Sequence, residues 1–250
     1  MDKSIAAIRA DENCTGMRTI LMILYILILV CACIARCSGH VYVVIYATLN
    51  GKTGHAGIAI DNYDIITSGA VEDTVANGTL TYFDLWPSKD DFGLFSFSTD
   101  QDAVYYKLPN AIWSDPITLV LLYDLGIPHR EDYPADAILK FKTRPYQDFL
   151  LRRHLEQVME EKKVFNPRFY NCTDFVNEAL ALIRGAKLKV REFIPFSFTS
   201  TPNKLCRKLM NLPETIVIKS PGDRINGSFF RERVLEKKKN GNDSVFAASR

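Results

Sequence analysis

The chain has 250 residues, 47% of them hydrophobic, and its 31 basic side chains nearly balance its 29 acidic ones. This size and apolar content suit one folded domain after an N-terminal segment. The balanced charge gives no indication of a broad basic surface for nucleic acid, and no nucleic-acid partner is expected. The densest basic cluster, EKKK at residues 236–239, lies in a polar stretch, and we predict that residues 231–250 form a mobile tail.

The first predicted element is an uncharged apolar run at residues 19–35, TILMILYILILVCACIA, with an arginine on each side. This pattern is typical of an export signal, and the run is slightly short for a membrane span of about 20 residues. We therefore interpret residues 1–37 as a signal peptide or a membrane anchor. Cleavage, lipidation at Cys33 and retention as an anchor are all open, and each places the protein in the periplasm or at the cell envelope.

The next residues predict strands, because β-branched and aromatic residues recur with turn signals between them. Asp61-Asn62 is interpreted as the turn of a hairpin, and the stretch from 69 to 101 as an irregular connection, a lid or a binding loop. Its aromatic part from Tyr82 to Phe97 is interpreted as an acyl site, a lid or core. The strands predicted in this half of the chain cover residues 40–48, 54–60, 63–68 and 102–108.

The second half of the chain predicts mostly helices, with residues 117–125 open between strand and helix. In the first predicted helix, Phe149 is expected in the apolar stripe with Leu151, Leu155, Val158 and Met159. Helices are expected at residues 143–163, 172–184 and 200–211, and a last strand at 215–219. Strands followed by helices indicate an α+β fold, and residues 38–230 are expected to form its one domain.

Cys172 stands where the second of these helices begins, with Asn171 or Thr173 available as the cap. The partial positive charge and free N–H groups of a helix start favour a thiolate, so the position suits a nucleophile. His55 lies among small residues at the start of a predicted strand, which leaves room for another element to approach. A cysteine with an imidazole base is an acyl-transfer pair, and a third polar group is expected to orient the ring.

Six cysteines are present, at positions 14, 31, 33, 37, 172 and 206. Only Cys172 and Cys206 lie outside the N-terminal segment, so no disulfide framework is indicated. A disulfide between these two is the structural alternative to a nucleophile. No His or Cys spacing indicates a metal, no cofactor is expected, and Gly51-Lys52-Thr53 lacks the first glycine of a phosphate-binding loop.

Two segments resemble the circularly permuted branch of the NlpC-type, papain-like cysteine peptidases, a branch that includes the lecithin:retinol acyltransferase-like proteins. Residues 54–60, GHAGIAI, are similar to the histidine strand of that superfamily, and residues 171–176, NCTDFV, to the start of its cysteine helix. The histidine strand precedes the cysteine helix in the permuted branch, as it does here. The resemblance implies one papain-like domain with an antiparallel sheet packed against helices.

The resemblance also implies roles for residues. Cys172 would be the nucleophile, His55 the base, and Thr67 the orienting group, with Asp64 and Glu72 as alternatives. Many relatives have His, Asn, Gln or Glu at the position of Thr67, so this chain departs from the pattern there.

The residues before the cysteine have two interpretations each. Asn171 would line the substrate and oxyanion site or cap the helix. Tyr170 would line the pocket, donate to an oxyanion or pack in the core.

The function expected from these observations is an exported thiol hydrolase that cleaves an amide or ester through an acyl-cysteine intermediate. Peptidoglycan peptide is the first candidate substrate, because the export signal places the protein in the cell envelope. A lipid acyltransferase or lipid hydrolase of the same fold is the second possibility. A non-catalytic envelope protein that binds a partner is the third. Oligomeric state is left open.

Overall fold

The computed structural model describes residues 20–25, 38–48, 54–68, 71–89, 99–127, 134–194 and 197–226. It divides into two compact units, one of residues 1–38 and 65–75 and the other of residues 39–64 and 76–250. In the first unit residues 20–25 are helical, and no helix among the described residues is long and apolar enough to cross a membrane. The predicted tail at 231–250 and most of the predicted segment at 1–37 lie outside the described residues.

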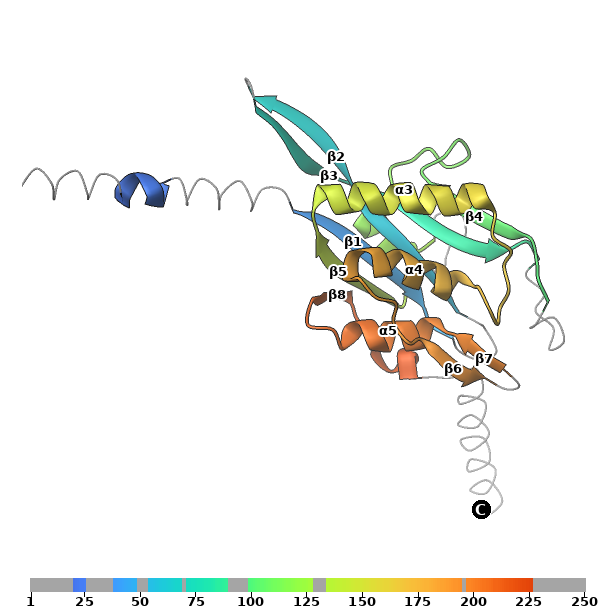
Figure 1. Ribbon diagram of the computed structural model, residues 1–250. Coiled ribbons are helices and arrows are strands. Elements are labelled where there is room, and N and C mark those ends of the chain that lie inside the picture. Colours follow the sequence, from blue (N-terminus) through green and yellow to red (C-terminus); the bar gives the residue numbers. More distant parts are fainter. Residues whose placement is uncertain are drawn as a thin grey trace, which may run out of the picture. The chain divides into compact units, whose positions relative to one another are not determined.

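The fold is α+β, with an antiparallel sheet packed against helices (Figure 1). The six-stranded sheet has the order β4-β3-β2-β1-β5-β8, and β6 and β7 form a separate two-stranded ribbon. The strands are β1 (Gly39–Tyr46), β2 (His55–Ser68), β3 (Val71–Pro87), β4 (Ala103–Leu108), β5 (Ala137–Thr143), β6 (Arg191–Ile194), β7 (Ser197–Ser200) and β8 (Thr215–Lys219). The helices are α2 (Leu119–Asp124), α3 (Pro145–Glu161), α4 (Cys172–Arg184), α5 (Pro202–Met210) and the 3-10 helix η2 (Gly222–Asn226).

Each face of the central strand β1 packs into a different apolar cluster. Val41, Val43 and Ile45 belong to a cluster that also contains buried apolar side chains of α3, α4 and α5. Tyr42, Val44 and Tyr46 belong to a second cluster that includes Leu122 of α2. Because side chains alternate along a strand, these clusters lie on opposite faces of the sheet. Figure 1 shows α3, α4 and α5 over one of these faces.

Two predictions in the strand region were wrong. β2 runs from His55 to Ser68, and Asp61 and Asn62 continue the strand instead of forming a turn. Their side chains make hydrogen bonds within the fold, Asp61 with His40 and Asn62 with Thr79. The stretch taken as irregular contains the 17-residue strand β3. Residues 117–125, left open, contain helix α2.

Candidate active site

His55 is the first residue of β2 and pairs with Tyr46, the last residue of β1. Gly54 turns the chain into the strand with φ +69, a conformation that favours glycine. A Cβ on Gly54 would lie 2.6 Å from the carbonyl oxygen of Tyr46 and 2.8 Å from the amide nitrogen of Thr48. The close approach of β1 therefore fixes the backbone immediately before the imidazole.

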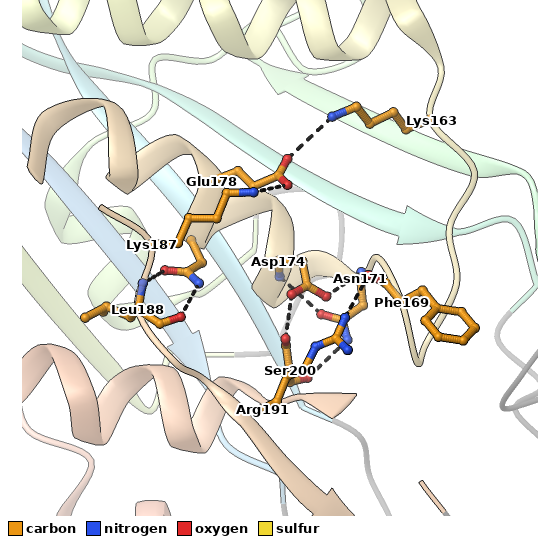
Figure 2. A network of polar contacts seen from close by, with 10 residues as sticks. Lys163, Phe169, Asn171, Asp174, Glu178, Lys187, Leu188, Arg191 and Ser200 are labelled. Carbon is orange, nitrogen blue, oxygen red and sulfur yellow. Dashed lines mark hydrogen bonds and ion pairs between the residues drawn. The ribbon is translucent and has the colours of Figure 1, made fainter. Parts of the chain in front are cut away.

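Cys172 is the first residue of α4 and is buried, as is His55. The side-chain oxygen of Asn171 accepts the N–H groups of Thr173 at 2.8 Å and Asp174 at 3.3 Å, which caps the helix. Asp174 returns a bond to the N–H of Asn171 and accepts another from Ser200 in β7. Figure 2 shows this cluster at the start of α4. The caps and the ribbon together hold the backbone that carries the sulfur.

Asn171 has its polar atoms engaged in structure. Besides the two cap bonds, its amide donates to the carbonyl oxygens of Pro167 at 2.9 Å and Ser200 at 3.1 Å, and to the hydroxyl of Thr199 at 3.2 Å. The side chain is buried among these partners. Of the two predicted roles, the structure places Asn171 in that of the helix cap.

The imidazole contacts a buried carboxylate that the sequence pattern did not single out. His55 Nε2 lies 3.1 Å from Oδ2 of Asp84, and Asp84 is 0% exposed. The same oxygen accepts from the hydroxyl of Tyr82 at 3.1 Å and from the indole N–H of Trp86 at 2.7 Å. An ionised carboxylate can only accept, so Nε2 carries the proton and Nδ1 is the ring nitrogen left for the thiol.

Of the two other residues that bond Asp84, one packs against the imidazole and the other against β2. The ring of Trp86 stacks on His55 with centroids 4.0 Å apart and planes 25° from parallel. A Cβ on Gly57 would lie 2.1 Å from the hydroxyl oxygen of Tyr82, so only glycine fits at that position of β2. Tyr82, Asp84 and Trp86 alternate with Phe83 and Leu85 along β3, whose side chains are buried in the other apolar cluster. This alternation is the signal in the sequence that could have located the carboxylate.

The contact between His55 and Cys172 is visible in the electrostatics of the ring. Burial lowers the pKa of His55, but the charge of Cys172 and hydrogen bonds to Asp84 and Cys172 outweigh burial and raise the pKa to about 9. An imidazolium between a thiolate and a carboxylate is stabilised by both anions. The arrangement can therefore hold a proton on His55 at neutral pH.

Other predicted site residues lie elsewhere. Thr67 is exposed and belongs to the unit of residues 1–38 and 65–75, whereas His55, Asp84 and Cys172 belong to the other unit. Because β2 continues past residue 61, Thr67 is not on a strand that returns beside the imidazole. Of the alternatives, Asp64 is exposed and accepts from Asn77, and the side chain of Glu72 lies outside the described residues.

Tyr170 packs on the side of α4 rather than among the partners of His55. It lies partly buried against the first apolar cluster, with the ammonium of Lys163 5.1 Å from its ring centroid. Burial and the nearby charge of Glu178 raise its pKa. These surroundings favour the packing role over the oxyanion role.

The two cysteines outside the N-terminal segment are both free and buried. Cys206 lies in α5 within the first apolar cluster, and burial raises its pKa to about 12. Its surroundings are those of an inert core thiol. Within the described ranges, no group of three or more His, Cys, Asp or Glu side chains could hold a metal ion.

The aromatic stretch from Tyr82 to Phe97 divides between these environments. Tyr82 and Phe83 are buried, one in each apolar cluster, and Trp86 covers the imidazole. Phe92 and Phe95 lie outside the described residues.

No protein-family model, no curated protein and no solved structure matches the chain.

Proposed function

We propose that this chain is a cysteine hydrolase of permuted papain-like fold that cleaves an amide or ester bond. The observation that carries the proposal is one buried histidine placed between a helix-start cysteine and a carboxylate. Such an arrangement supplies a nucleophile, a base and an orienting group, which together define acyl-transfer catalysis. Asp84 takes the orienting role that the resemblance gave to Thr67.

The chemistry follows from which ring nitrogen is free. His55 Nδ1 takes the proton of the Cys172 thiol, and the sulfur attacks the acyl carbon of the substrate. The imidazolium then gives its proton to the leaving amine or alcohol, and a thioester remains on Cys172. His55 next takes a proton from water, and the hydroxide attacks the thioester carbon. The sulfur leaves as the thiolate, the acid is released, and the imidazolium returns its proton to the sulfur. Asp84 stabilises the imidazolium in both halves of the reaction.

The negative oxygen that forms during each attack needs a hydrogen-bond donor. The cap formed by Asn171 takes the N–H groups of Thr173 and Asp174. We assign the oxyanion to the N–H of Cys172, a helix-start donor that this cap does not use. The positive end of the helix dipole adds to the same stabilisation.

The substrate we propose is a peptide of the cell envelope, with peptidoglycan peptide first. The support is the apolar, arginine-flanked run at residues 19–35, which is typical of export. Transfer of an acyl group to or from a lipid is the alternative on the same residues. In that case the apolar ring of Trp86 over the imidazole would contact the acyl chain.

The decisive experiment measures alkylation of Cys172 by iodoacetamide, read on its own peptide by mass spectrometry. We expect fast labelling of the wild type at pH 7 and loss of that reactivity in His55→Ala, because the variant has no imidazolium to hold the thiolate. Cys206 is the internal control and should label slowly in both proteins. Equal, slow labelling of Cys172 in both would refute the enzyme and favour a binding protein.

A second measurement separates the substrates. Peptidoglycan stem peptides and lipid esters are offered to the wild type and to Cys172→Ser, and product release is followed. Turnover of the peptides that Cys172→Ser abolishes would support the first substrate class. Turnover of lipid esters alone would move the proposal to lipid acyl chemistry.

A further inference from the structure

The first turns of α3 expose an apolar stripe, and the sequence pattern had assigned one of its members, Phe149, to the core. Leu151, Leu155 and Val158 are buried, but Phe149, expected beside them, is 59% exposed. Tyr146 is 70% exposed and Leu150 42% exposed. Residues 146, 149 and 150 have the spacing i, i+3 and i+4, so they lie on one side of the helix. We call this side the α3 outer stripe.

The charges around the α3 outer stripe have one sign. Lys142, Arg144 and Arg153 are exposed, and Arg153 continues the stripe one turn further. Asp148, the acidic residue of these first turns, is fully buried on the opposite side of the helix. Aromatic side chains flanked by cations are typical of surfaces that lie in the headgroup region of a bilayer.

We propose that the α3 outer stripe rests on the surface of an anionic bilayer. The aromatic rings of Tyr146 and Phe149 enter the headgroup region, and the exposed cations contact lipid phosphates. The inference concerns where the folded unit sits and does not depend on the chemistry of Cys172.

The test uses the full chain reconstituted into vesicles of phosphatidylcholine and phosphatidylglycerol that carry brominated acyl chains. Phe149→Trp places a fluorophore on the stripe, and Phe198→Trp places one on the exposed face of β7 as the matched control. The signal of the wild type, which has Trp86 and Trp113, is subtracted. We expect the bromines to quench the tryptophan at position 149 and to leave the one at position 198 unquenched.

A second part of the experiment tests the exposed cations around the stripe. Arg144→Glu with Arg153→Glu in the Phe149→Trp protein should reduce quenching in anionic vesicles. Equal quenching at positions 149 and 198, or none at either, would overturn the proposal. So would emission at position 149 that shifts with protein concentration and ignores the lipid, since that outcome indicates a second copy on the stripe. Alkylation of Cys172 should be the same in all these variants, so the result is independent of the proposed function.

Discussion

At the scale of single residues, the site depends on one carboxylate oxygen that receives several donors. Asp84 Oδ2 accepts from His55, Tyr82 and Trp86, and these bonds fix which imidazole nitrogen faces Cys172. In the proposed reaction the carboxylate acts only through the ring. Its replacement should therefore change the protonation of His55 before it changes anything else.

The first prediction compares Asp84→Asn with Thr67→Ala. Burial lowers the pKa of His55, and the carboxylate of Asp84 is one of the groups that raise it. In Asp84→Asn the pKa should therefore fall from about 9. Alkylation of Cys172 at pH 7 should slow by roughly tenfold or more, in line with general-base effects. NMR titration of the imidazole gives the pKa directly. Thr67→Ala should change neither the pKa of His55 nor the alkylation rate of Cys172. If both fell in Thr67→Ala and neither fell in Asp84→Asn, the orienting role would return to Thr67.

The sequence located part of this site and missed the rest for a physical reason. Cys172 and His55 stand in short local motifs, a helix start and a small-residue strand, which can be recognised without the fold. Asp84 is 29 residues from His55, and their contact depends on how far β2 extends before the chain turns back. With a turn placed at residues 61–62, the partner strand was sought too early.

At the scale of elements, α4, which carries the proposed nucleophile, is tied to neighbouring segments at its first turn. Asn171 links α4 to the chain before it through Pro167 and to β7 through Thr199 and Ser200. A cap that also joins two elements should affect both stability and the placement of the sulfur.

The second prediction concerns Asn171→Ala, with Thr201→Ala as its matched control. Thr201 caps α5 by accepting from Lys204, so each variant removes one helix cap. Each should lower the free energy of unfolding by about 1 kcal/mol, and Asn171→Ala by more because buried partners lose their donor. Only Asn171→Ala should also slow alkylation of Cys172. Denaturant titration and labelling rates check both, and equal labelling losses would assign the effect to general destabilisation.

The third prediction concerns the contact between β2 and β3. Gly57→Ala places a methyl group on the ring of Tyr82, 2.1 Å from its hydroxyl oxygen, and the ring is fully buried. We expect a loss of about 1–3 kcal/mol in the free energy of unfolding, as for other overpacked cores. Tyr82→Leu removes the obstacle, so the double variant should lose less than the two single losses combined. Strict additivity in denaturant titrations would contradict the collision.

The elements themselves were predictable to different degrees. β1, α3, α4, α5 and β8 carry regular apolar patterns, and the predicted ranges overlap the observed ones. Phe149 shows the limit of such patterns, because it continues an apolar series yet faces outward. β3 was missed because Asn77-Gly78 within it is a turn signal, and Gly78 has φ +82 while the strand continues.

At the scale of the whole molecule, several acids are buried in the folded state. Burial raises the pKa of Asp61, Asp148 and Asp174, in each case against hydrogen bonds that lower it. Carboxyls with raised pKa in the folded state contribute stability that is complete below their unfolded pKa. That contribution is lost as the pH rises through the folded pKa. These three groups therefore favour the folded state more at acidic than at neutral pH.

The fourth prediction isolates Asp148, which accepts from the hydroxyl of Tyr63. Asp148→Asn keeps an acceptor oxygen and removes the buried charge, so it should stabilise the protein relative to wild type at pH 7. The difference should shrink or reverse as the pH falls, because burial raises the pKa of the wild-type carboxyl and so favours its neutral form. Asp115→Asn, at an exposed position, should show little change over the same pH range. A difference for Asp148→Asn that stays constant with pH would show that burial does not raise the pKa of this carboxyl.

Because Trp86 stacks on His55, its fluorescence should report whether the imidazole is protonated. The centroids of the two rings are 4.0 Å apart, and a cation so close to an aromatic ring perturbs the electrons of that ring. Because the ring is protonated up to about pH 9, tryptophan emission should change across that pH. Trp86→Phe, which leaves Trp113 as the emitter, should show no such step. Proton transfer in the proposed reaction could then be followed in real time without any label.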